Sequence, residues 1–227
     1  MILDIKKAHV YHVSNVLIAF ILMGILLQTT FLVIFPFDGQ ATSLFNAFAE
    51  RPLIGLFHSD LLGLIISLFN VFILLSLSLF LYHFKPLLSF IALTLGLLGI
   101  TLYMAQHDIV ELHTLFTLYQ KDSNITYLNH AQFTLDLHYN TAWMMSKIVL
   151  GISWLLYGII FFIAKNVSSM LRVITILLGL MAIMGVFFEN NIIYSVCLSI
   201  IALGFYSLLW VSFHRNIKTI KKEVSTD

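Results

Sequence analysis

The chain has 227 residues, of which 60% are hydrophobic and only 10% are charged, and its formal net charge is +1. Soluble domains carry about 25% charged residues, so this chain has too few to cover a soluble surface, and its mean hydropathy of +0.97 agrees. The single cysteine excludes a disulfide-stapled secreted domain, and the balanced charge gives no sign of nucleic-acid binding. The composition indicates a polytopic membrane protein whose partner is the lipid bilayer.

Six apolar stretches are long enough for a helix to cross a bilayer core of ~30 Å, which takes about 20 residues. They cover residues 13–35, 53–82, 87–106, 142–164, 173–188 and 192–213. Their unbroken apolar runs lack the alternation of period two that a membrane β-barrel requires. The first run is also too long for a cleaved signal peptide. We therefore predict an all-α fold, in which residues 1–227 form a single bundle of six transmembrane helices.

The distribution of Lys and Arg predicts the orientation, because cytoplasmic loops are enriched in both residues. With both termini in the cytoplasm, nine of the twelve basic residues lie on the inner side. These nine are Lys6, Lys7, Lys85, Lys165, Arg172, Arg215, Lys218, Lys221 and Lys222. We predict a multi-pass protein of the cell inner (plasma) membrane, with cytoplasmic N- and C-termini and a basic cytoplasmic tail at residues 214–227.

The longest connection, residues 107–141, is predicted to form an extracytoplasmic helical hairpin between spans three and four, with its turn near Ser123. Antiparallel helices that turn there place Glu111 opposite Asp136. The hairpin also brings two histidines to this face, and imidazoles and carboxylates are common ligands of divalent metals. The metal site predicted in this way consists of His107, Glu111, Asp136 and His138.

Other interpretations of the histidines remain open. No HExxH or CxxC pattern accompanies the outer cluster, and histidines at membrane interfaces are more often amphipathic boundary residues than metal ligands. A haem would need two histidines facing each other inside the bundle, whereas His58 is the single well-embedded one.

Two charged residues fall inside predicted spans, where a charge costs several kcal/mol unless it is paired or solvated. Asp60 begins a stripe of small and polar residues on span two, and Lys147 begins another on span four. The two stripes consist of Asp60, Gly63, Ser67 and Asn70, and of Lys147, Gly151, Trp154 and Gly158. We predict that both stripes face one polar interior, in which Asp60 and Lys147 pair. In the alternative, Lys147 extends to the outer headgroups and Asp60 is hydrated at the helix end.

These features favour a non-enzymatic function. We expect an outward-facing polar cavity that binds a small molecule, a lipid or an ion, with transport as one use of it. Its ligand-binding residues would be Asp60, Lys147, Asn70 and His58. No catalytic residue is assigned, because the sequence contains no GxSxG, P-loop or Rossmann pattern. The alternatives are a membrane-embedded metal-dependent enzyme that uses the outer cluster, and an immunity-type protein that docks a partner. Homo-oligomerisation stays open.

Three segments resemble a family of bacterial six-span integral membrane proteins of unknown function. Arg51-Pro52-Leu53 followed by Asp60-Leu61-Leu62-Gly63 is similar to the second span of that family. The outer insert that leads into a span with Trp143 and Trp154 is also similar, as is Ser169-Met170-Leu171-Arg172 before a glycine-rich span. The chain departs from the family in lacking a proline and a tryptophan in this inner loop. The resemblance covers nearly the whole chain and implies no catalytic residues.

Overall fold

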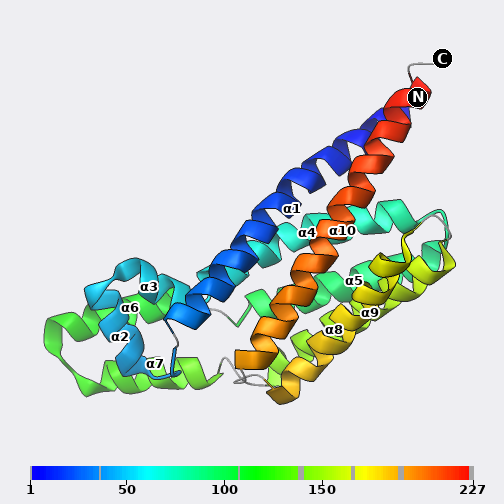
Figure 1. Cartoon of the computed structure of the whole chain (residues 1–227). Coiled ribbons are helices and arrows are strands. Elements are labelled where there is room, and N and C mark those ends of the chain that lie inside the picture. Colours follow the sequence, from blue (N-terminus) through cyan, green and yellow to red (C-terminus); the bar gives the residue numbers. More distant parts are fainter. Residues whose placement is uncertain are drawn as a thin grey trace.

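The computed structural model describes residues 2–35, 37–106, 108–137, 141–164, 167–188 and 192–224, and it contains no strand in these ranges (Figure 1). Six helices are long and apolar enough to cross a membrane. The prediction of an all-α polytopic membrane protein is therefore confirmed. The helices are α1 (Ile2–Ile34), α2 (Ala41–Glu50), α3 (Pro52–His58), α4 (Leu61–Leu81), α5 (Pro86–Met104), α6 (Ile109–Asp122), α7 (Ile125–Leu137), α8 (Thr141–Ile163), α9 (Ser169–Phe188) and α10 (Ile192–Val224).

Local chemistry explains several helix ends. Pro52 and Pro86 stand at the first positions of α3 and α5, where a missing N–H leaves no hydrogen bond unmade. The carboxylate of Asp108 caps α6 by accepting from the N–H of Glu111 at 2.8 Å. Between these ends, helices are the form that satisfies every backbone polar group within one segment in lipid.

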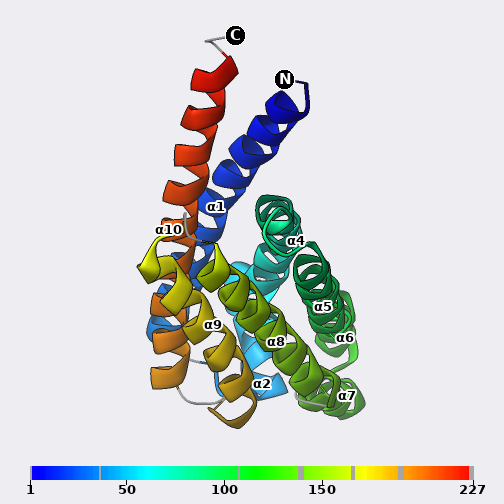
Figure 2. The same cartoon turned by 90° about the vertical axis from the view of Figure 1, so that its right-hand side faces the viewer.

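The long helices share one hydrophobic core, in which α4 contacts α5 and α9 contacts α10. α8 packs between α5 and α9, while α1 packs against α10 and α4. The beginning of α1 and the end of α10 lie at the same end of the bundle (Figures 1 and 2), as an even number of spans requires. The short helices α2, α3, α6 and α7 gather at the opposite end (Figure 1). The predicted hairpin is present there as the antiparallel pair α6 and α7.

The structure adds a helix between spans one and two that the sequence analysis did not predict. α2 buries Leu44, Phe45 and Phe48 in an apolar cluster with Leu112 of α6 and Leu135 of α7. The hairpin therefore has a small hydrophobic core of its own, which fixes its position relative to the chain that leaves α1.

The predicted second span, residues 53–82, is interrupted at Asp60. The backbone of Asp60 has φ 62°, in the left-handed region, and separates α3 from α4. Aspartate is one of the few residues other than glycine that adopt this conformation at modest cost. Asp60 thus lies directly before the first turn of α4, and not seven residues inside a span.

The predicted stripe on span four also differs from the structure. A Cβ on Gly179 of α9 would lie 2.8 Å from the carbonyl oxygen of Gly151, and a Cβ on Gly158 would meet Ile176 of α9. Gly151 and Gly158 therefore face α9 and not a polar interior. The reason is that small residues let membrane helices approach closely and gain van der Waals contact.

Candidate functional site

A cluster of polar and aromatic side chains surrounds Asp60, where α1, α4, α5 and α8 come together. Its Oδ1 atom accepts a hydrogen bond from Nε2 of Gln28 at 3.1 Å, and its Oδ2 atom accepts one from the hydroxyl of Tyr103. The ammonium nitrogen of Lys147 lies 5.1 Å from the ring centroid of Tyr103 and 5.1 Å from that of Trp143. We call these five residues the Asp60 cluster.

The Asp60 cluster supplies both charges with favourable contacts at the edge of the apolar region. The carboxylate has two hydrogen-bond donors, and the ammonium lies against two electron-rich rings, an arrangement worth about 2 kcal/mol when it is desolvated. Asp60 and Lys147 therefore face the same region, because both contact Tyr103. A direct ion pair between them stays a prediction. Gln28 and Tyr103 were missed, since nothing in the sequence distinguishes them from other span-end polar residues.

The other two predicted ligand-binding residues have different partners. The amide oxygen of Asn70 accepts a hydrogen bond from the hydroxyl of Tyr206, which joins α4 to α10. The ring of His58 stacks on Phe37 with 4.8 Å between centroids, and its Nε2 atom lies 3.2 Å from the carbonyl oxygen of Phe35. Burial lowers the pKa of His58 below 6.5, so the imidazole is neutral at pH 7. The contacts described here assign Asn70 and His58 to separate parts of the bundle.

A pocket opens where the hairpin joins the bundle. It has a volume of about 400 Å³ and is formed by the C-terminal end of α5, the residues that begin α6, the second half of α7 and the beginning of α8. Its lining residues are Leu102, Ala105, Gln106, Asp108, Glu111, His130, Phe133, Thr134 and Ala142.

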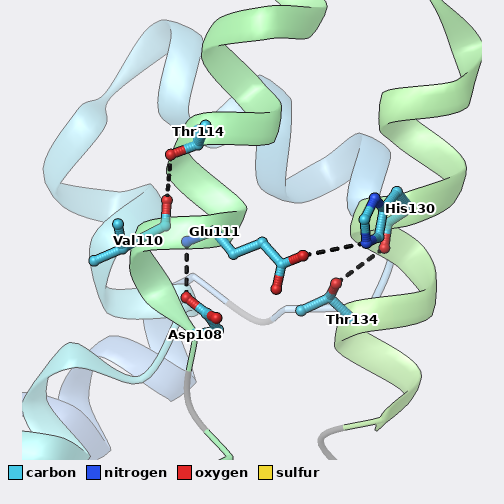
Figure 3. Close-up of polar contacts among 6 residues, drawn as sticks. All are labelled: Asp108, Val110, Glu111, Thr114, His130 and Thr134. Atoms are coloured by element: carbon cyan, nitrogen blue, oxygen red, sulfur yellow. Dashed lines mark hydrogen bonds and ion pairs between the residues drawn. The ribbon is translucent and has the colours of Figure 1, made fainter.

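One wall of the pocket is polar (Figure 3). Glu111 reaches across from α6, and its Oε1 atom lies 3.1 Å from Nε2 of His130 on α7. The hydroxyl of Thr134 donates to the carbonyl oxygen of His130 at 3.1 Å. Gln106 and Asp108 add two further polar side chains, and the rest of the lining is apolar, with Leu102 and Phe133 as its larger side chains. The pocket therefore combines hydrogen-bonding groups with hydrocarbon.

The predicted metal site is only partly described, because His107 and His138 lie outside the described residues. The predicted placement of Glu111 opposite Asp136 stays a prediction, and the two carboxylates have separate partners among the described residues. Asp136 accepts from Nε2 of Gln132 at 2.9 Å, and Oε1 of Gln132 accepts from the N–H of Ala41 at 2.8 Å. Gln132 therefore satisfies the first amide of α2 and ties this part of α7 to α2.

Within the described ranges, no three His, Cys, Asp or Glu side chains come together as a metal site. Comparison with known protein families, curated proteins and solved structures finds no match. The resemblance to a six-span bacterial family thus rests on sequence segments alone and stays a prediction. The chemistry of the site itself must carry any functional conclusion.

Proposed function

We propose that the protein binds a small amphiphilic molecule in the pocket between the hairpin and the bundle, as a non-enzymatic protein of the inner membrane. The observation that carries the proposal is the cavity of about 400 Å³, which is lined by Glu111 and His130 together with apolar side chains. Binding sites for small molecules typically enclose about 300–1,000 Å³ and combine apolar walls with a few polar groups.

The position of the pocket suits a ligand that reaches it through the bilayer. α5 has 19 residues and at ~1.5 Å per residue already spans the hydrocarbon core. The hairpin that continues from it extends beyond the membrane-crossing helices (Figure 1). The pocket at this junction therefore lies at the boundary between hydrocarbon and water. The bias of Lys and Arg supports an extracytoplasmic location for the hairpin.

The Asp60 cluster adjoins the pocket. Tyr103 and Trp143 belong to the cluster, and the residues next to them in the chain, Leu102 and Ala142, line the pocket. The hydrogen bond of the Tyr103 hydroxyl to Asp60 and the contacts of Lys147 with both rings hold the end of α5 beside the beginning of α8. We assign the Asp60 cluster a positioning role, to which an Asp60–Lys147 ion pair would contribute.

Photolabelling tests the proposal. The protein is placed in phosphatidylcholine nanodiscs with trace amounts of a dodecyl amphiphile whose chain carries a diazirine, and labelled peptides are sequenced. We expect saturable labelling at Leu102 and Phe133. Ala105→Trp, which fills the pocket from an exposed position of its lining, should abolish it. The matched control is Ala49→Trp, on the exposed side of α2. Equal labelling of wild type and Ala105→Trp, spread over lipid-facing residues such as Phe20, would overturn the proposal.

A divalent metal is the second candidate ligand, because Glu111 and His130 already lie 3.1 Å apart. Such a metal would make the outer cluster with His107 and His138 a site for metal-dependent chemistry. Elemental analysis of protein purified without chelator, and again after dialysis against EDTA, distinguishes the candidates. A stoichiometric metal that is lost in both Glu111→Gln and His130→Gln would favour this second function.

A further inference from the structure

We infer that the polar group bound in the pocket is a primary ammonium, held between the amide oxygen of Gln106 and the carboxylate of Glu111. The inference rests on the proposed function and specifies its ligand class. It starts from the hydrogen-bonding capacity that the described lining residues leave unused.

Gln106 presents an acceptor without a donor. Its Nε2 atom donates to the carbonyl oxygen of Leu102 at 2.5 Å, which identifies the other atom of the amide as the oxygen. This Oε1 atom is buried and has no hydrogen-bond partner among the described residues. A buried acceptor is expected to have a donor. Because Gln106 lines the pocket, a bound molecule can supply that donor.

Glu111 adds a charged acceptor to the same pocket. Its Oε1 atom contacts His130, and within the described part of the chain its Oε2 atom has no hydrogen-bond partner. Asp108 contributes a second carboxylate to the lining. Of the described residues that line the pocket, none is Lys or Arg. The balance of charge therefore favours a cation over an anion.

The form of the cation follows from the acceptors. A primary ammonium carries three N–H donors, enough for Gln106, Glu111 and one further oxygen. A quaternary ammonium has no donor and is recognised by a cage of aromatic rings, whereas Phe133 is the one phenyl, phenol or indole ring among the described lining residues. Leu102, Phe133 and Ala142 offer hydrocarbon to an alkyl chain. Both an aminophospholipid and a single-chain amine present this chemistry.

Competition against the photolabel of the previous section tests the inference, with the diazirine chain carrying a primary amine. The competitors in phosphatidylcholine nanodiscs are dodecylamine, dodecanol and dodecyltrimethylammonium, with phosphatidylethanolamine as a guest lipid in a separate arm. We expect dodecylamine to compete at least about tenfold better than the alcohol and the quaternary amine, because hydrogen bonds to a charged group are the strong ones. Glu111→Gln and Gln106→Leu should each remove most of that advantage. Glu50→Gln, an exposed carboxylate on α2, is the control that keeps it.

The outcomes separate the two proposals. Competition by phosphatidylethanolamine supports the inference and identifies a lipid headgroup as the source, while competition by dodecylamine alone supports a single-chain amine. Equal competition by dodecanol or by dodecyltrimethylammonium overturns the ammonium inference and leaves the proposed amphiphile site standing. Saturable labelling that Glu111→Gln and Gln106→Leu both leave unchanged also overturns it. Labelling that none of these compounds displaces overturns the proposed function as well.

Discussion

A substitution at Gly63 tests the geometry of the Asp60 cluster directly. A Cβ placed there would lie 2.6 Å from Oδ2 of Asp60 and closer still to Oδ1 and to the hydroxyl oxygen of Tyr103. Real Cβ atoms do not approach other atoms this closely. Gly63→Ala must therefore separate the carboxylate from the tyrosine, although it adds just one methyl group.

The expected cost follows from three contributions. Loss of a hydrogen bond to a charged group costs about 1.5–3 kcal/mol, and the displacement of packed neighbours adds about 1 kcal/mol or more. Alanine regains about 1 kcal/mol of helix propensity over glycine. The net destabilisation is about 2 kcal/mol, which corresponds to a fall in Tm of about 4–8 °C for a chain of this size.

Thermal unfolding in detergent, followed by circular dichroism, measures this effect. The matched control is Gly24→Ala on α1, whose Cβ would meet only the side chain of Ile66 at 3.1 Å, a contact that a flexible side chain can relieve. In a Tyr103→Phe background, Gly63→Ala should cost about 1 kcal/mol less, since part of the clash and the hydrogen bond are already gone. If Gly63→Ala unfolds within 1 °C of Gly24→Ala, at roughly the wild-type Tm, the Asp60 cluster does not have this geometry.

Three further predictions use the same unfolding assay. Gly179→Ala should cost about 1–3 kcal/mol, because its Cβ would meet the backbone of Gly151 at 2.8 Å; an unchanged Tm would contradict the close packing of α8 and α9. Tyr206→Phe should lower the free energy of unfolding by about 1 kcal/mol, because it removes the donor to Asn70. Combined with Asn70→Leu, it should cost less than it does alone, because the acceptor is already gone. Burial lowers the pKa of His58 below 6.5 in the folded protein. As the pH falls, the imidazole is therefore protonated in the unfolded chain before it is protonated in the folded one. Tm should then fall as the pH drops below 6.5, and less steeply in His58→Phe; parallel profiles would refute this.

Composition and apolar run length were sufficient to predict the six membrane-spanning helices, because a bilayer permits few other structures. They were insufficient at Asp60, where the polar residues His58-Ser59-Asp60 and one left-handed backbone conformation interrupt a stretch whose overall hydropathy predicts a single span. The sequence does carry a signal for α2, since Leu44, Phe45 and Phe48 follow helical spacing. This helix is nevertheless too short to be found in a search for membrane spans.

The site depends more on tertiary contacts than the fold does. Spacing missed Tyr103, whose hydroxyl donates to Asp60 and whose ring lies against Lys147. Helix spacing also did not predict the contact of Glu111 with His130 or the hydrogen bonds that Gln132 makes with Asp136 and with the first amide of α2. Contacts between elements far apart in the chain are not encoded in local pattern.

Isothermal titration calorimetry of dodecylamine into nanodisc-embedded protein tests the central claim most directly. We predict one saturable site in the wild-type protein, a Kd about tenfold weaker in Glu111→Gln, and loss of the site in Ala105→Trp, which fills the pocket. Identical, non-saturating heats from wild type and Ala105→Trp, equal to partitioning into empty nanodiscs, would contradict it.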